Sequence, residues 1–193
     1  MLDRKEIEFR LKDVDPQLCV IFAARCSLRV LPLLVTNQNK ENFWYWNKSD
    51  RSKNVLAIFM AQQVSLNISY FGGNNRNYYI AASFATAAAS SALAVTTISA
   101  ASSVAATAIA AVAFAADASA SSASSAFFAA VSTKNIGIEE EILIDLDKIT
   151  NTIVSERITP LSFNYLPLWS TTISKDWQLL YQRFSKSLIA LDE

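Results

Sequence analysis

The middle of the chain is a block of alanine and serine that leaves little choice of secondary structure. Residues 81–131 contain 24 alanines and 11 serines, with no glycine and no proline. Alanine has the highest intrinsic helix propensity of all residues, whereas glycine and proline have the lowest. The composition therefore predicts helix throughout this block.

The block is too long to form a single helix within a compact protein. At about 1.5 Å per residue it would make a rod of roughly 75 Å, whereas a compact chain of 193 residues has a radius of gyration near ~16 Å. We expect a hairpin or a three-helix arrangement that breaks at residues 96–103 and 118–125, where serine and threonine can hydrogen-bond to the backbone. Larger side chains spaced alternately three and four apart are typical of closely packed antiparallel helices.

A membrane hairpin is the alternative interpretation of the same block. Residues 77–116 are 40 consecutive uncharged positions, which is long enough for one or two spans. From residue 93 to residue 116, however, the strongly apolar side chains contribute only about −2 to −4 kcal/mol to insertion, and serine and threonine offset most of that. We therefore favour a soluble bundle, and keep a membrane-active effector whose hairpin inserts into a bilayer as the alternative.

Helices are also expected on both sides of the block. Asp15 followed by Pro16 predicts a helix start, and Pro32 predicts its end near residues 29–30. Further helices are expected over residues 54–68, 139–152 and 174–191, whereas residues 159–168, with two prolines, are expected to be extended or irregular. The sequence thus predicts an all-α single-domain bundle of six or seven helices, in which residues 1–76 and 135–193 flank a central Ala/Ser-rich hairpin at residues 77–134.

The composition excludes histidine-dependent catalysis and several kinds of metal site. The chain contains no histidine, which removes Ser-His-Asp triads, Cys-His dyads and histidine-ligated metals. Its two cysteines, Cys19 and Cys26, cannot build a four-cysteine zinc site, and they are expected to be buried, reduced thiols. With 17 basic and 17 acidic residues, the chain lacks the positive charge that drives nucleic-acid binding. We expect a cytoplasmic protein without catalytic residues, cofactor or metal.

Two arginines on the first long helix predict an acidic partner inside the fold. Arg25 and Arg29 are four residues apart in an apolar helix, so they lie on the same face. A buried guanidinium without a partner costs several kcal/mol. We expect a structural ion pair with Asp117, the lone acid of the Ala/Ser block, with Asp145 and Asp147 as the other candidates.

Two surface features could bind a partner protein. A polar stretch at residues 36–53 contains four consecutive aromatic residues, of which some should fill a helix interface and the others remain exposed. Exposed tryptophan and tyrosine are enriched at interface hot spots. The second feature is an acidic run that opens a helix, where it is most simply a solvated first turn but could also meet a basic partner. The candidate partner-binding residues are Trp44, Tyr45, Trp46, Glu139, Glu140 and Glu141.

The run AARCSLRVLPL at residues 23–33 resembles the opening motif of Ala-rich helical bacterial proteins, some of which are labelled immunity proteins of polymorphic toxin systems. In those proteins a second helix and a long Ala-rich block follow, as residues 54–68 and 81–131 do here. Pro167-Leu168-Trp169 and Trp177 are similar to the ending of a related bacterial set. The resemblance implies a non-enzymatic interaction module that binds another protein, such as a toxin or a defence-system component.

Overall fold

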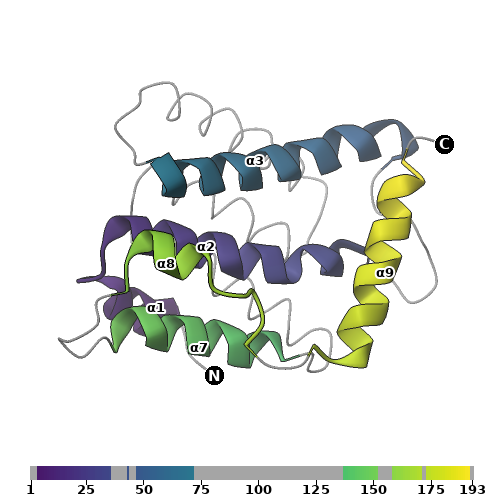
Figure 1. The fold of residues 1–193 in the computed structure, drawn as a ribbon. Coiled ribbons are helices and arrows are strands. Elements are labelled where there is room, and N and C mark those ends of the chain that lie inside the picture. The colour runs from purple at the N-terminus through teal and green to yellow at the C-terminus, as the bar shows by residue number, and fades with distance from the viewer. Residues whose placement is uncertain are drawn as a thin grey trace.

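The computed structural model describes residues 4–35, 43, 47–71, 137–151, 158–170 and 173–191. In these residues the chain forms six α-helices, two short 3-10 helices and no strand (Figure 1). The all-α prediction is therefore confirmed. The predicted Ala/Ser hairpin at residues 77–134, with Asp117, lies outside the described residues, as do Trp44, Tyr45 and Trp46.

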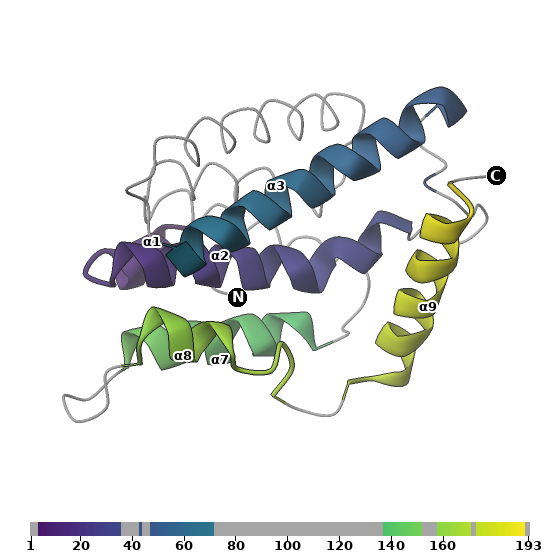
Figure 2. The same ribbon diagram turned by 45° about the horizontal axis from the view of Figure 1, so that its top comes forward.

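Helix α2 (Pro16–Val30) is the centre of the described fold. It lies between α3 (Arg51–Phe71) on one side and α7 (Ile138–Thr150) on the other, and the short α8 (Pro160–Asn164) also packs on it (Figures 1 and 2). Most of its side chains are buried. Residues 16–35 are long and apolar enough to span a membrane by composition, but 94% of that window is buried inside the fold, as in the core helix of a soluble protein.

The ends of α2 follow from local chemistry that the sequence displays. The Asp15 side chain accepts a hydrogen bond from the Gln17 backbone N–H at 2.7 Å, and Pro16 occupies the first turn, where no intrahelical N–H is needed. Beyond Val30 the chain tightens into a 3-10 helix, η1 (Leu31–Val35), which contains Pro32. The predicted start and end of this helix are therefore confirmed.

Helix α8 corrects the expectation of an extended segment at residues 159–168. The Thr159 side chain accepts a hydrogen bond from the Ser162 N–H at 3.1 Å, and the Ser162 hydroxyl accepts one from the Thr159 N–H at 2.9 Å. These reciprocal bonds form a capping box, with Pro160 in the first turn. Pro160 therefore starts a helix here instead of preventing one, and only the stretch after Asn164 is irregular.

The remaining helices close the fold around α2. Helix α1 (Arg4–Leu11) packs on α7, while α9 (Lys175–Ile189) lies across the end of the layer against η1 (Figures 1 and 2). Phe43, from the aromatic run, is fully buried and makes an edge-to-face contact with Phe184 of α9 at 6.0 Å. This ring fills a helix interface, as expected for part of that run.

Candidate functional site

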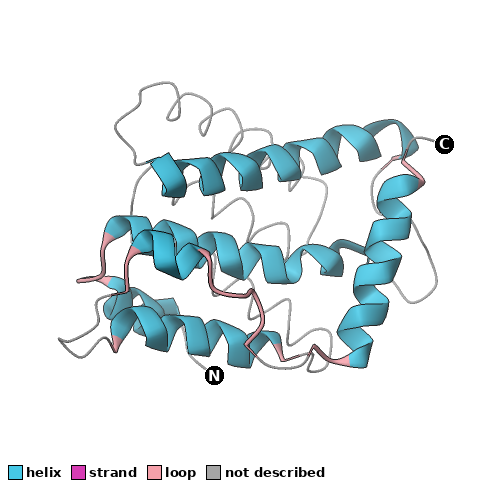
Figure 3. Ribbon diagram, viewed as in Figure 1, coloured by secondary structure: helices cyan, strands magenta, loops and turns pink. Residues whose placement is uncertain are grey.

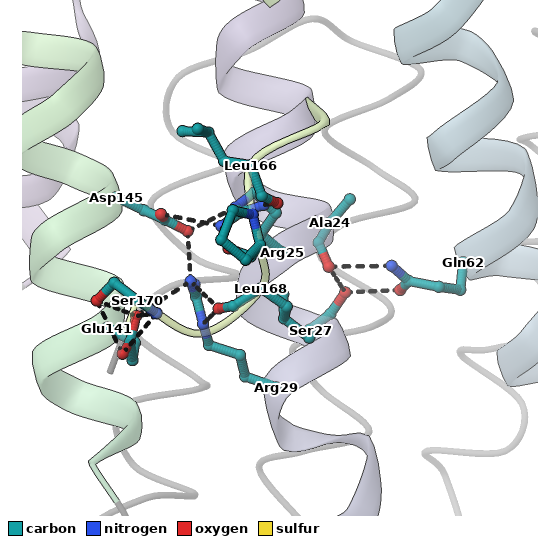
Figure 4. Close-up of polar contacts among 11 residues, drawn as sticks. Ala24, Arg25, Ser27, Arg29, Gln62, Glu141, Asp145, Leu166, Leu168 and Ser170 are labelled. Carbon is teal, nitrogen blue, oxygen red and sulfur yellow. Dashed lines mark hydrogen bonds and ion pairs between the residues drawn. The ribbon is translucent and has the colours of Figure 1, made fainter. Parts of the chain in front are cut away.

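Four charged side chains meet in the interior between α2 and α7 (Figure 4). Arg25 and Arg29 are one turn apart on α2, and Glu141 and Asp145 are one turn apart on α7. All four are at most 4% exposed. We call this group the charge cluster. Its two positive and two negative groups balance, which offsets part of the cost of removing them from water.

Asp145 is the centre of the charge cluster. The Arg25 Nε donates to Asp145 Oδ2 at 2.7 Å and its Nη2 donates to Oδ1 at 3.2 Å, in a bidentate arrangement. The Arg29 Nη2 lies 2.6 Å from the same Oδ2 atom. Asp145 is thus the acid that the structure pairs with both arginines, and the first candidate, Asp117, lies outside the described residues. Asp147 points elsewhere, because its carboxylate pairs with Arg10 of α1.

The two arginines also bind the backbone of the irregular segment that follows α8 (Figure 3). Arg25 donates to the Leu166 carbonyl at 2.8 Å and to the Pro167 carbonyl at 2.7 Å. Arg29 donates to the Leu168 carbonyl from Nε at 3.0 Å and from Nη2 at 2.7 Å. We call residues 166–168 the strap. Its three consecutive carbonyl groups all accept hydrogen bonds from buried guanidinium groups.

Glu141 fixes the far end of the same segment. Its carboxylate accepts hydrogen bonds from the Ser170 backbone N–H at 2.9 and 3.0 Å and from the Ser170 hydroxyl at 3.0 Å. Its Oε2 lies 3.9 Å from the Arg29 Nη2. The charge cluster thus holds residues 166–170 against α2 and α7.

The expectation that Glu141 belongs to an exposed acidic patch is wrong. It is 2% exposed and faces the interior, while Glu140 is exposed and Glu139 is half-buried. The physical reason is that Glu141 and Asp145, one turn apart, share the face of α7 that packs on α2. Their spacing of four, which matches that of the two arginines, is the signal that could have predicted their burial.

Aromatic rings cover both guanidinium groups. The Arg25 Cζ lies 5.1 Å from the centre of the Phe163 ring, and the Arg29 Cζ lies 6.0 Å from the centre of the Trp169 ring. Trp169 makes an edge-to-face contact with Trp177 of α9 at 4.9 Å. The two stretches that carry the resemblance, residues 23–33 and 167–169, are therefore in direct contact.

A second, uncharged connection joins α2 to α3. The Gln62 side chain donates to the Ala24 carbonyl at 3.0 Å and accepts from the Ser27 hydroxyl at 2.6 Å (Figure 4). All of these groups are buried. Together with the charge cluster, this bridge shows that the polar groups of α2 hold neighbouring elements in place.

The two cysteines are buried and unbridged, as predicted. Burial raises the pKa of the Cys19 thiol to about 12, and the Asp15 carboxylate adds to the rise. Burial likewise raises the pKa of Cys26 to about 12, which outweighs the lowering effect of Arg29. Because the thiolate is the reactive form, neither thiol is a nucleophile at neutral pH.

The geometry makes the charge cluster structural. Its charged groups bond to one another and to the strap, and no water-exposed face is left for a substrate. Within the described ranges, no group of three or more histidine, cysteine, aspartate or glutamate side chains could hold a metal ion. Comparisons with protein-family models, curated proteins and solved structures find no match for this chain. The resemblance to immunity proteins therefore stays a prediction.

Proposed function

We propose that this protein is a non-enzymatic module that binds another protein through the outward face of α3. The observation that supports this is a stripe of large apolar side chains in water. Leu56 is 59% exposed, Phe59 38% and Met60 52%. At positions i, i+3 and i+4 they share one face of the helix, and we call them the α3 stripe.

The α3 stripe is held on a rigid support. On the adjoining face of the helix, Val55, Ile58 and Gln62 are buried, and Gln62 is bonded to α2. Phe59 stacks on Phe184 of α9 with ring centres 6.3 Å apart. A preorganised apolar face loses little conformational entropy on binding, as is typical of surfaces that receive a partner helix or groove.

Charge narrows the class of partner. Helix α3 carries the exposed Lys53 in its first turn and no acidic residue along its 21 positions. A complementary partner surface is therefore apolar with an acidic end. The resemblance of residues 23–33 makes a toxin or a defence-system component the partner that we propose.

The test compares two variants that each change two exposed apolar side chains. Leu56→Ser/Met60→Ser removes two members of the α3 stripe, and Leu179→Ser/Ile189→Ser changes two side chains on α9 that are 56% and 71% exposed. In affinity purification from cells of the source organism, the wild type and the α9 variant should retain the same acidic partner, and the α3 variant should lose it. Loss from both variants, or from neither, would refute the proposed surface.

The membrane-active effector remains the alternative function. It depends on residues 77–116, which lie outside the described residues. Release of dye from anionic vesicles by the purified protein, without any stable protein partner, would favour it over the interaction module.

A further inference from the structure

A cleft of about 650 Å³ opens where the last turns of α1 and α7 meet the first turn of α2. These helix ends lie at the left side of the view in Figure 1. The cleft is lined by α1, the turn that leads into α2, α2 itself and the C-terminal end of α7. Its volume is in the range of small-molecule sites.

Among the described residues that line the cleft, the one cation, Arg10, is already neutralised. Arg10 pairs with the Asp147 carboxylate, and its Nη2 also donates to the Thr150 hydroxyl at 2.8 Å. The Thr150 hydroxyl donates in turn to the Leu146 carbonyl at 2.8 Å. Arg10 is thus held in the wall of the cleft, so it is not available to attract an anion.

Two further carboxylates, Asp13 and Asp15, make the cleft negative. Asp15 accepts the N-terminal hydrogen bond of α2, and in the described part of the chain no cation pairs with either carboxylate. The C-terminal ends of α1 and α7 both point here, each adding roughly half a negative charge, while the N-terminus of α2 adds roughly half a positive one. The net field therefore favours a cationic ligand.

The rest of the lining is mixed: Thr150 and Asn151 are polar, and five side chains, those of Phe9, Val14, Leu18, Ile149 and Ile158, are apolar. Phe9 is 78% exposed at the rim, and Leu18 and Ile149, at 6% and 5% exposure, form the floor. A bare metal ion would make no favourable contact with these apolar side chains, and the described residues that line the cleft do not supply a set of metal ligands. An organic cation with an apolar body matches both the charge and the lining.

We propose that this cleft binds a primary amine or guanidinium carried on an alkyl or aromatic body. The charged head lies beside Asp13 and Asp15, and the body lies against Phe9 and the aliphatic floor. A free amine and the lysine or arginine side chain of another protein present the same chemistry. The proposal is independent of the α3 stripe, which belongs to a different part of the surface.

Titration of the ¹⁵N-labelled full-length protein with hexylamine, 1-hexanol and Nα-acetyl-lysine amide tests the proposal. Comparing hexylamine with hexanol measures the contribution of the charge. Comparing hexylamine with the lysine derivative distinguishes a free amine from a protein side chain as the ligand. We expect saturable amide shifts confined to residues 9–18 and 149–151, with hexylamine binding about fivefold more tightly than hexanol, the upper range for an exposed ion pair. Stronger binding of the lysine derivative would identify a partner side chain as the ligand, and stronger binding of hexylamine a free amine.

Variants then locate each part of the site. Asp13→Asn, at an exposed position, should reduce hexylamine affinity about twofold, part of the way to the level of hexanol, because Asp15 remains. Phe9→Ala should weaken both probes alike, because it removes only apolar contact. Glu140→Gln, an exposed acid at the opposite end of α7, is the matched control and should change nothing. Equal binding of hexylamine and hexanol to the wild type, or shifts spread over the whole surface, would overturn the proposal.

Discussion

Asp145→Asn should be among the most destabilising single substitutions in the described part of the chain. Asp145 is fully buried and makes three contacts with arginine nitrogen atoms, at 2.6, 2.7 and 3.2 Å. Asparagine keeps the shape of the side chain but removes its charge, and its amide nitrogen cannot accept a hydrogen bond. Arg25 and Arg29 would then be buried with Glu141 as the only acid of the charge cluster, 3.9 Å from Arg29.

The expected loss in the free energy of unfolding is about 3–5 kcal/mol, the cost of removing one partner from a buried ion pair. Domains are stable by only about 5–15 kcal/mol, so this is a large fraction. With an m-value of roughly 2 kcal/mol/M in urea, the unfolding midpoint should fall by about 1.5–2.5 M. Circular dichroism at 222 nm follows the transition directly, because the described fold is helical.

Asp147→Asn is the matched control on the same helix. Its side chain is 55% exposed and pairs with Arg10, so its loss should cost at most about 1 kcal/mol. If Asp145→Asn costs no more than Asp147→Asn, the charge cluster does not stabilise the fold as argued. A combined variant, Arg25→Met/Asp145→Asn, should cost less than the sum of its two parts, because the two groups interact directly.

Three further predictions concern the core and one helix end. Cys19 and Cys26 should resist Ellman's reagent at pH 8 in the folded protein and react on unfolding. Burial raises their pKa values from the ordinary 9.0 to about 12, so the stability that they contribute is present below pH 9 and is lost as the pH rises towards 12, which urea titrations across that range would measure. Gln62→Leu should cost about 0.5–1.5 kcal/mol in chemical denaturation, because Ser27 loses its amide partner but keeps its hydrogen bond to the Ala24 carbonyl at 2.9 Å. Gly137→Ala should cost about 1 kcal/mol through backbone strain alone, because φ is +75° and a Cβ there meets nothing within 4 Å, while Gly137→Asn should cost less in the same measurement.

Local chemistry accounts for what the sequence predicted correctly. The cap at Asp15, Pro16 and Pro32 defines α2 without any tertiary information, because each acts on its own backbone neighbours. The error at Pro160 has the same origin. Proline ends a helix when it lies in the interior but is favourable in the first turn. The Thr159 cap places Pro160 in the first turn, so Pro160 starts a helix here.

Tertiary packing accounts for what could not be predicted. The spacing of Arg25 and Arg29 indicates that an acid must face them, but the choice of Asp145 depends on which helix packs on α2. Glu141 illustrates the same limit, since acids are favoured in any first helical turn whether that turn faces water or the core. No sequence pattern could predict that the backbone carbonyl groups of the strap bind the arginines, because every residue has a carbonyl group.

The distance along the chain between the arginines and the strap has a consequence for biosynthesis. Arg25 and the Leu166 carbonyl that it binds are 141 residues apart. At about 5–20 residues per second, the ribosome needs roughly 7–28 s to make that interval. For most of this time α2, which is long and apolar enough to span a membrane by composition, has left the ribosome while Asp145, 120 residues after Arg25, and the strap do not yet exist. The core therefore closes late in synthesis, and the nascent chain needs protection from aggregation for most of its elongation.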